Sequence, residues 1–554
     1  MSRATVFCSR AFLIAILFSS VFVIQASADS ADDAMTAIHP ETIRADMRFL
    51  SDDLLEGRGT ATRGYEIAAK FMASQFEALG LKPAGDNGTY WQNVPLRKMN
   101  VDESKTALTL VRDGKEETLE FRKDYITAAD PGRAESSVDA PVVFVGYGIT
   151  APDQNYDDYK NVDVHGKIVA YMFGAPKFQS AIKAHYSSSA EKAENASAHG
   201  AVGAIILDDL VLEGMYSFSE RVRDLTIPSY RWLDKEGNAN NYHPKLKVIA
   251  QLSLDATKRF FEGSGHTGDE IFAAIKAGNP VSFATSITAK IQNTTISQDV
   301  HSPNVVAEIE GSDPTLKNEY LVYTAHLDHL GIGEAVKGDK IYNGTLDNAS
   351  GSATLLEIAR AFMQVNPRPR RSVIFVNVTG EEAGLLGSDY YATHPTVPKK
   401  SIVADINVDE VLMLWPMQDV ISFGAEHSSL AAVMDKAAAH MHVTVSPDPM
   451  PQQVIFIRSD QYSFVKQGIP SMMPTPGFKS SDSNIQPEKI FGEWEETRYH
   501  QPQDDMEQPG LDFKAAAAFA KFSFLCGYIV TQDPQRPTWN KKDFFGQHYS
   551  KNSQ

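Results

Sequence analysis

Short apolar runs that alternate with helical patterns predict a parallel sheet in the C-terminal half of the chain. The runs with strand length are 304–309, 320–324, 372–378 and 403–408. Residues 351–364 repeat apolar side chains at helical spacing, and 513–530 predict a long last helix. Strands that alternate with helices are typical of a sheet covered on both faces. We therefore expect an α/β fold with a mixed, mostly parallel sheet and helices on both faces.

The pattern differs in the N-terminal half. Residues 41–80 predict two helices that flank a glycine-broken loop, and from about residue 139 short strands are mixed with one alanine-rich helix. This change of pattern predicts a small β-rich α/β domain inserted into the larger one. No cluster of metal-binding or nucleophilic residue types occurs in the inserted segment, so we expect a lid or a substrate-selecting module there.

The predicted domain boundaries follow from these patterns. We expect the larger domain over 29–135 and 290–535, the inserted domain over 136–289, and a polar, loosely held C-terminal tail over 536–554. A chain of 554 residues is too long for one ordinary hydrophobic core, which agrees with a division into two domains.

The first 28 residues have the features of a signal peptide. Arg3 and Arg10 flank a short stretch that leads into the apolar run 11–24, and Ala26-Ser27-Ala28 has the small-x-small pattern of a cleavage site. We expect an exported protein, periplasmic or secreted, without an integral membrane span after cleavage. An uncleaved membrane anchor is the alternative. Only Cys526 remains in the mature chain, so no intramolecular disulfide can form.

The charge excludes one class of partner. The formal net charge is −18, whereas proteins that bind nucleic acid or anionic membranes present a basic face. We expect no nucleic-acid partner.

Polar residues of metal-binding types follow the predicted strands or begin the predicted helices. They are His326 with Asp328, Asp347, Glu381 with Glu382, Asp409, and His500 with Asp504. Singly, such residues are more often helix caps, hydrogen-bonding groups or solvated charges. Together they form a mixed nitrogen and oxygen ligand set beyond strand ends, where open α/β sheets bind ligands. This set suits zinc, with cobalt or manganese as substitutes. No Gly-x-Ser-x-Gly motif points to a serine nucleophile.

These motifs resemble those of the M28 metallopeptidases, the di-zinc aminopeptidase group. The matching segments are Ala325-His-Leu-Asp-His-Leu-Gly331, Leu346-Asp-Asn-Ala-Ser-Gly351, Gly380-Glu-Glu-Ala-Gly-Leu385, Asn407-Val-Asp409 and Tyr499-His-Gln-Pro502. The likeness covers roughly residues 40–135 and 290–530. The inserted segment resembles a protease-associated (PA) domain through Gly146-Tyr-Gly148 and the strand at 203–207.

The resemblance implies a role for each matching residue. Asp347 would bridge two Zn²⁺ ions. His326 and Asp409 would complete one metal site, and Glu382 and His500 would complete the other. Glu381 would be the general base, taking a proton from the attacking water and delivering it to the leaving amine.

Three further residues are assigned less directly. Asp328 would orient the His326 imidazole as a supporting residue that does not itself bind the metal. Arg458 matches a family segment that lines the substrate pocket, and a structural pair with Asp460 is the alternative. His329 is an additional imidazole that either supports the site or faces solvent. The group that polarises the substrate carbonyl stays unassigned.

The expected function is that of an exported di-zinc exopeptidase that cleaves N-terminal peptide bonds of peptide substrates. Three alternatives stay open: a carboxypeptidase or dipeptidase on the same scaffold, a binding protein of the same architecture without activity, and a single-metal cyclase of glutaminyl termini. Residue specificity and oligomeric state do not follow from the sequence.

Overall fold

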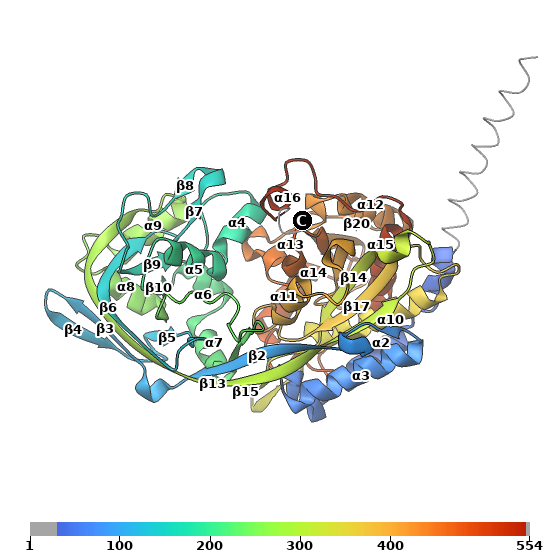
Figure 1. The fold of residues 1–554 in the computed structure, drawn as a ribbon, viewed down its shortest axis with the longest axis horizontal. Helices are drawn as coiled ribbons and strands as arrows, with labels where there is room; N and C mark the ends of the chain where they lie inside the picture. Colours follow the sequence, from blue (N-terminus) through green and yellow to red (C-terminus); the bar gives the residue numbers. More distant parts are fainter. Residues whose placement is uncertain (1–29, 550–554) are drawn as a thin grey trace, which may run out of the picture.

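The chain folds into two lobes that are joined by long strands along one side of the molecule (Figure 1). The computed structural model describes residues 30–549. The predicted signal peptide, residues 1–28, therefore lies outside the described residues. We call the lobe that contains the C-terminal half of the chain the larger domain, and the other lobe the smaller domain.

A mixed sheet forms the centre of the larger domain. Its strands follow in the order β11 (Ser229–Trp232), β2 (Trp91–Val101), β13 (Ser282–Ile309), β17 (Ser372–Val378), β14 (Tyr320–His326), β18 (Ile402–Asn407), β21 (Ser471–Pro476), β19 (Asp419–Phe423) and β20 (Thr444–Val445), with the short β1 (Lys82–Pro83) beside the end of β13. The four strands β17, β14, β18 and β21 run parallel, so their carboxyl ends meet at one edge.

Helices cover both faces of this sheet. One face packs against α2 (Pro40–Leu50), α3 (Arg63–Leu79), α10 (Ser350–Gln364), α12 (Leu430–Met441) and α15 (Phe513–Gln532), and the other against α11 (Leu386–Thr393) and α13 (Gln461–Val465). Strand β14 shows why: Leu321 and Tyr323 belong to the first hydrophobic core, while Val322 between them belongs to the second. The predicted mixed, mostly parallel sheet with helices on both faces is confirmed.

Helix α15 is long and apolar enough to cross a membrane by length and composition. In the structure, however, 72% of its most apolar stretch is buried inside the protein, against α10, α2 and α12. Its composition is thus explained by its place in the core. Cys526 on this helix is fully buried, as expected for a small apolar side chain.

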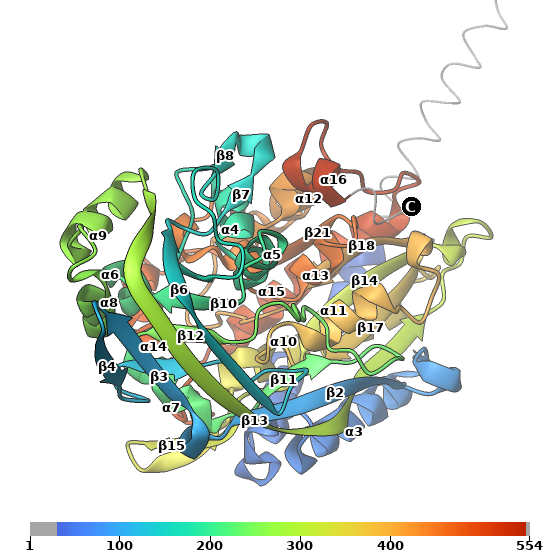
Figure 2. The ribbon, with the colours of Figure 1, turned by 60° about the vertical axis from the view of Figure 1, so that its left-hand side comes forward.

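The smaller domain has its own sheet (Figure 2). Its strands follow in the order β4 (Lys115–Leu119), β3 (Ala107–Arg112), the first part of β13, β6 (Glu135–Val145), β9 (Ile168–Met172), β10 (Gly203–Leu207), β12 (Ile249–Leu252) and β5 (Tyr125–Thr127). Its helices are α4 (Ser180–Ser187), α5 (Ser189–Ala198), α6 (Leu210–Met215), α7 (Phe218–Arg223), α8 (Leu254–Phe261) and α9 (Gly268–Ala277).

Strand β13 belongs to both sheets, which changes the predicted boundaries. Its residues 282–294 pair within the smaller domain, and its residues 295–309 pair with β2 and β17 of the larger one. The predicted boundary at residue 290 therefore falls inside a continuous strand. Residues 107–127, which we had assigned to the larger domain, form β3, β4 and β5 of the smaller domain. Alternating apolar residues indicate a strand but do not indicate which sheet it joins.

The prediction of a loosely held tail was wrong for the described part of that segment. Helix α16 (Phe544–Tyr549) is anchored by Phe545, which is fully buried, and by Tyr549, which is 8% exposed. Both pack in a cluster with Tyr462 of α13. Three aromatic residues in a short polar segment were the signal for this helix.

Two segments of the inserted region, α7 of the smaller domain and β11 of the larger sheet, contact loops beside the carboxyl edge of the parallel strands. Arg223 at the end of α7 donates a hydrogen bond to the carbonyl of His500 at 3.5 Å. The hydroxyl of Tyr230 on β11 donates to the carbonyl of Thr60 at 3.0 Å. Segments of the inserted region therefore border the site described next.

Candidate metal centre

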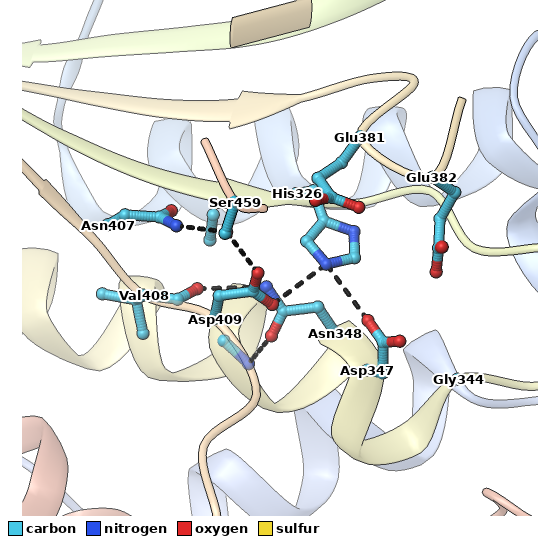
Figure 3. A network of polar contacts seen from close by, with 12 residues as sticks. His326, Gly344, Asp347, Asn348, Glu381, Glu382, Asn407, Val408, Asp409 and Ser459 are labelled. Atoms are coloured by element: carbon cyan, nitrogen blue, oxygen red, sulfur yellow. Dashed lines mark hydrogen bonds and ion pairs between the residues drawn. The ribbon is translucent and has the colours of Figure 1, made fainter. Parts of the chain in front are cut away.

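The five predicted ligands meet at the carboxyl edge of the parallel strands. His326 ends β14, Glu382 follows β17, Asp409 follows β18, Asp347 lies in the helical turn η7 (Thr345–Ala349), and His500 lies after α14 (Pro487–Thr497). The side chains of His326, Asp347 and Asp409 converge, with Glu382 beyond Asp347 (Figure 3). The site is therefore built from segments that lie up to 174 positions apart along the chain, from His326 to His500 by subtraction.

Asp347 stands between two groups of donor atoms. Its Oδ1 lies 3.1 Å from His326 Nε2, and Asp409 Oδ1 lies 3.0 Å from the same nitrogen. Its Oδ2 lies 3.2 Å from His500 Nε2, and Glu382 Oε2 lies 3.3 Å from that nitrogen. Each carboxylate oxygen of Asp347 thus faces a different imidazole, as a bridging ligand of two ions requires.

The chemistry of the donor set fits zinc. In a tetrahedral zinc site with ligand bonds of about 2.0–2.1 Å, neighbouring ligand atoms lie about 3.3 Å apart. The four nitrogen–oxygen distances of 3.0–3.3 Å match this spacing. Glu382 Oε1 is buried without a hydrogen bond of acceptable geometry, and no Lys or Arg among residues 30–549 forms an ion pair with Asp347, Glu382 or Asp409. Among the described residues, imidazoles are therefore the only basic side chains paired with these carboxylates.

The electrostatics of the protein groups agree with a site for cations. Burial lowers the pKa of His500, but the charges of Glu382 and Asp347 outweigh this effect and raise it to about 9. Burial likewise opposes a rise for His326, yet Asp409 and Glu381 raise its pKa well above the ordinary value. Both imidazoles are thus drawn toward binding a positive charge, either a proton or a metal ion.

Glu381, the predicted base, faces the cluster but is not one of its donors. Its carboxylate forms no hydrogen bond or ion pair with any residue in the described range 30–549. Burial, reinforced by the nearby carboxylates of Glu382 and Asp409, raises its pKa well above the ordinary value. A carboxylate that is held in place and has no partner can accept and release a proton.

Asp328 supports the site differently from the prediction. The His326 Nδ1 atom meets the backbone carbonyl of Asp328 at 3.0 Å, whereas the carboxylate lies 4.0 Å away. The carboxylate instead accepts hydrogen bonds from the backbone N–H of Glu381 at 3.2 Å and from the Thr60 hydroxyl at 2.9 Å. Asp328 therefore orients His326 through its main chain and holds the backbone of Glu381 through its side chain.

His329 does not face solvent, which settles one of the two alternatives. It is 1% exposed, and its Nδ1 lies 2.6 Å from Glu382 Oε1. The imidazole therefore lies at the edge of the second donor group.

Sequence reasoning assigned no role to three residues that hold the ligand-bearing loops. The fully buried Arg58 donates to the carbonyls of Leu327, Leu50, Asn343 and Gly344, and so joins the loops that carry His326 and Asp347. The fully buried Asp504 accepts from the backbone N–H groups of Leu346 and Asp347. The Ser459 hydroxyl donates to Asp409 Oδ2. Asp504 was named beside His500, but a contact with a residue more than a hundred positions away has no sequence signal in a single chain.

A cavity opens beside the donor cluster. The residues around it, besides the cluster itself, are Glu381, Glu410, Gln453, Ile455, Arg458, Ser459, Met473, Phe491, Trp494, Glu495 and Tyr499. Arg458 therefore lies where the sequence placed it, at the cavity, and no ion pair joins it to Asp460 within the described residues. Its nearest polar contact is the Tyr499 hydroxyl at 3.5 Å.

Comparison with protein-family profiles matches both domains. Residues 304–524 match Peptidase family M28, and residues 138–239 match the PA domain. The aminopeptidase from Aneurinibacillus sp. strain AM-1 has the same fold: it is 18% identical, with a TM-score of 0.53 over 93% of this chain and 99% of that chain.

Two curated relatives carry different names. An aminopeptidase of Pseudomonas aeruginosa is 24% identical over 64% of this chain and 54% of its own length. A glutamate carboxypeptidase 2 homolog of Caenorhabditis elegans is 26% identical over 49% of this chain and 37% of its own length. The chain thus spans about a third to a half of the length of these relatives. On the profile matches, residues 304–524 form a domain of peptidase family M28, and residues 138–239 form a PA domain inserted before it.

Proposed function

We propose that the chain is a zinc-dependent exopeptidase that releases N-terminal residues from peptides. The observation that carries the proposal is the pair of donor groups that share Asp347, with the unpartnered Glu381 carboxylate beside them. His326, Asp347 and Asp409 would hold one zinc ion, and Asp347, Glu382 and His500 the other. Bound zinc would polarise the scissile carbonyl and lower the pKa of the attacking water.

Glu381 supplies the proton transfer that hydrolysis requires. Its backbone is tied to Asp328, so the carboxylate is held at the cavity wall while its oxygens stay free of other partners. Such a group can take a proton from water and give it to the amine that leaves.

The cavity favours a substrate with a free amino terminus. Besides Glu381, it is lined by the carboxylates of Glu410 and Glu495, against the single guanidinium of Arg458. Glu410 directly follows Asp409 and forms no hydrogen bond or ion pair with a described residue. A carboxylate without a partner is suited to an α-ammonium group.

Apolar side chains form the rest of the cavity wall. They are Ile455, Met473, Phe491 and Trp494. A cavity with apolar walls and a few polar groups is typical of a small ligand site. We therefore expect an apolar N-terminal residue to be preferred.

A carboxypeptidase is the second candidate, and Arg458 is the observation that favours it. Its guanidinium lies at the cavity without an ion-pair partner in the described chain, so it could bind a substrate carboxylate. The name of the Caenorhabditis elegans relative, a glutamate carboxypeptidase 2 homolog, agrees with this alternative.

Blocked peptides separate the two candidates. We expect the zinc-loaded protein to cleave a Leu-initiated dipeptide amide and to leave the N-acetylated dipeptide acid intact; the reverse result would establish the carboxypeptidase. Two variants that remove a charge from the cavity separate the candidates further. Glu410→Gln should raise KM for the dipeptide amide, whereas Arg458→Gln should raise KM only if the substrate carboxylate is bound.

Glu381→Gln tests the base itself. Because general acid–base catalysis contributes about 10²–10⁴-fold, kcat should fall by that factor while both zinc ions stay bound. A variant with near-normal kcat would refute the role of Glu381.

A further inference from the structure

We propose that His329 is a positioning residue that fixes Glu382 as a ligand of the second zinc ion. The inference rests on the two-metal site of the proposed function, and it assigns a role to an imidazole that the five-ligand set leaves unused. His329 comes three residues after His326, so one segment would support both metal sites.

The two oxygens of Glu382 have different neighbours. Oε2 lies 3.3 Å from His500 Nε2, within the second donor group, and Oε1 lies 2.6 Å from His329 Nδ1. The side chain of Glu382 is only 7% exposed, and its Oε1 atom is buried. An Nδ1–H of His329 that turns toward Oε1 across this 2.6 Å contact would leave Oε2 free to serve as the ligand atom. Ligating carboxylates are commonly held by hydrogen bonds of this kind.

His329 lies outside the spacing of the ligand atoms themselves. Within each donor group, the nitrogen–oxygen distances are 3.0–3.3 Å, whereas His329 Nδ1 lies 3.9 Å from Asp347 Oδ2. The imidazole therefore reaches Glu382 but not the bridging carboxylate. This geometry favours a supporting contact over direct ligation.

The surroundings of His329 leave its ring little freedom. Its backbone N–H donates to the carbonyl of Arg58 at 3.2 Å. The ring lies directly against Gly344, where an added Cβ would come within 2.5 Å of His329 Cγ. On the other side the His500 ring lies at a centroid distance of 5.8 Å. A ring that is confined in this way can hold a flexible glutamate in one position.

Among the described residues, neither ring nitrogen of His329 nor Glu382 Oε1 has a hydrogen-bond partner of acceptable geometry, although His329 Nδ1 and Glu382 Oε1 lie 2.6 Å apart. Burying the polar nitrogens of an imidazole without hydrogen bonds costs folding free energy. A favourable interaction of the ring with another group must offset this cost. The contact with Glu382 is the one interaction near enough to provide this.

Two variants of nearly equal polarity test the proposal. In His329→Asn the side-chain amide nitrogen lies where Nδ1 lies, so the contact with Glu382 can be kept. In His329→Gln the amide lies farther out, near the position of Nε2, and the contact is lost. We measure zinc equivalents per chain and the affinity of each equivalent in a chelator titration, together with kcat and KM.

We expect His329→Gln to keep one tight zinc ion and to bind the second about 10–100-fold more weakly, the range for a lost supporting contact. His329→Asn should stay within a few-fold of the wild type at both sites. In His329→Gln, kcat at limiting zinc should fall and recover as zinc is added, with KM little changed.

The control is His185→Gln, which alters another fully buried imidazole; its hydrogen-bond and ring partners among the described residues are Tyr462, Tyr549 and neighbouring aromatic rings and include none of the donor residues. It should lower the melting temperature of the metal-free protein without changing either zinc affinity. Unchanged zinc affinities in His329→Gln, or equal losses in the Asn and Gln variants, would overturn the proposal. Because zinc binding does not depend on which peptide end is cleaved, failure here is distinct from failure of the aminopeptidase assignment.

Discussion

Replacing Asp328 by alanine should remove the hydrogen bond that holds the backbone of Glu381, the proposed base, beside the metal site. The fully buried Asp328 carboxylate accepts from the Glu381 N–H and from the Thr60 hydroxyl. A hydrogen bond to a charged group contributes about 1.5–3 kcal/mol, so the loss of both should lower the free energy of unfolding by about 3–6 kcal/mol.

Thr60→Val separates the two bonds. It removes only the hydroxyl, so the free energy of unfolding should fall by about 1.5–3 kcal/mol while the Glu381 tether stays intact. In Asp328→Ala the tether itself is lost. If its full contribution of about 1.5–3 kcal/mol is felt in the transition state, kcat should fall by about 10–150-fold.

The assays are urea unfolding of the zinc-loaded proteins, with equal m-values as a check, and kcat at saturating zinc. We expect Thr60→Val to lose stability but to keep kcat within a few-fold of the wild type. Equal losses of kcat in the two variants would refute the positioning of Glu381 by Asp328, because the Thr60 bond does not reach the base.

Three further outcomes are expected. Ser459→Ala removes the hydrogen bond to Asp409 Oδ2 and should weaken one of the two zinc ions about 10–100-fold in a chelator titration, with the other unchanged. Phe545→Ala should lower the free energy of unfolding by about 3–5 kcal/mol, because the ring is fully buried; a loss below 1 kcal/mol would show that the C-terminal helix is not anchored. N-terminal sequencing of the exported protein should begin at Asp29, and a chain that still begins at Met1 would favour the uncleaved anchor.

The parallel sheet and the converging strand ends could be predicted from the sequence because they rest on local patterns. The apolar runs at 320–324 and 372–378 are continuous, as strands buried on both faces must be, and they lie within β14 and β17. Because the carboxyl ends of parallel strands lie at the same edge of a sheet, polar residues directly after such strands come close together there. His326, Asp347 and Glu382 do lie within 4.8 Å of one another there, although their role as metal ligands stays a prediction.

The supporting contacts could not be predicted in this way. Arg58 lies 269 or more residues before Leu327, Asn343 and Gly344, and Thr60 lies 268 residues before Asp328; no local periodicity encodes such a pairing. At Asp328, the backbone carbonyl contacts the His326 imidazole and the carboxylate accepts from the Glu381 N–H. Which group contacts which residue depends on how the chain turns after β14. The assignment of residues 107–127 to the smaller domain required the pairing of β3 with β13.

The central claim is that one carboxylate serves two metal ions, and zinc content per chain tests it most directly. We expect two zinc equivalents in the wild type, one tight equivalent in Asp409→Ala, and weakened binding of both in Asp347→Ala, because each oxygen of Asp347 faces a different imidazole. A single equivalent in the wild type, or the loss of only one ion in Asp347→Ala, would contradict the account.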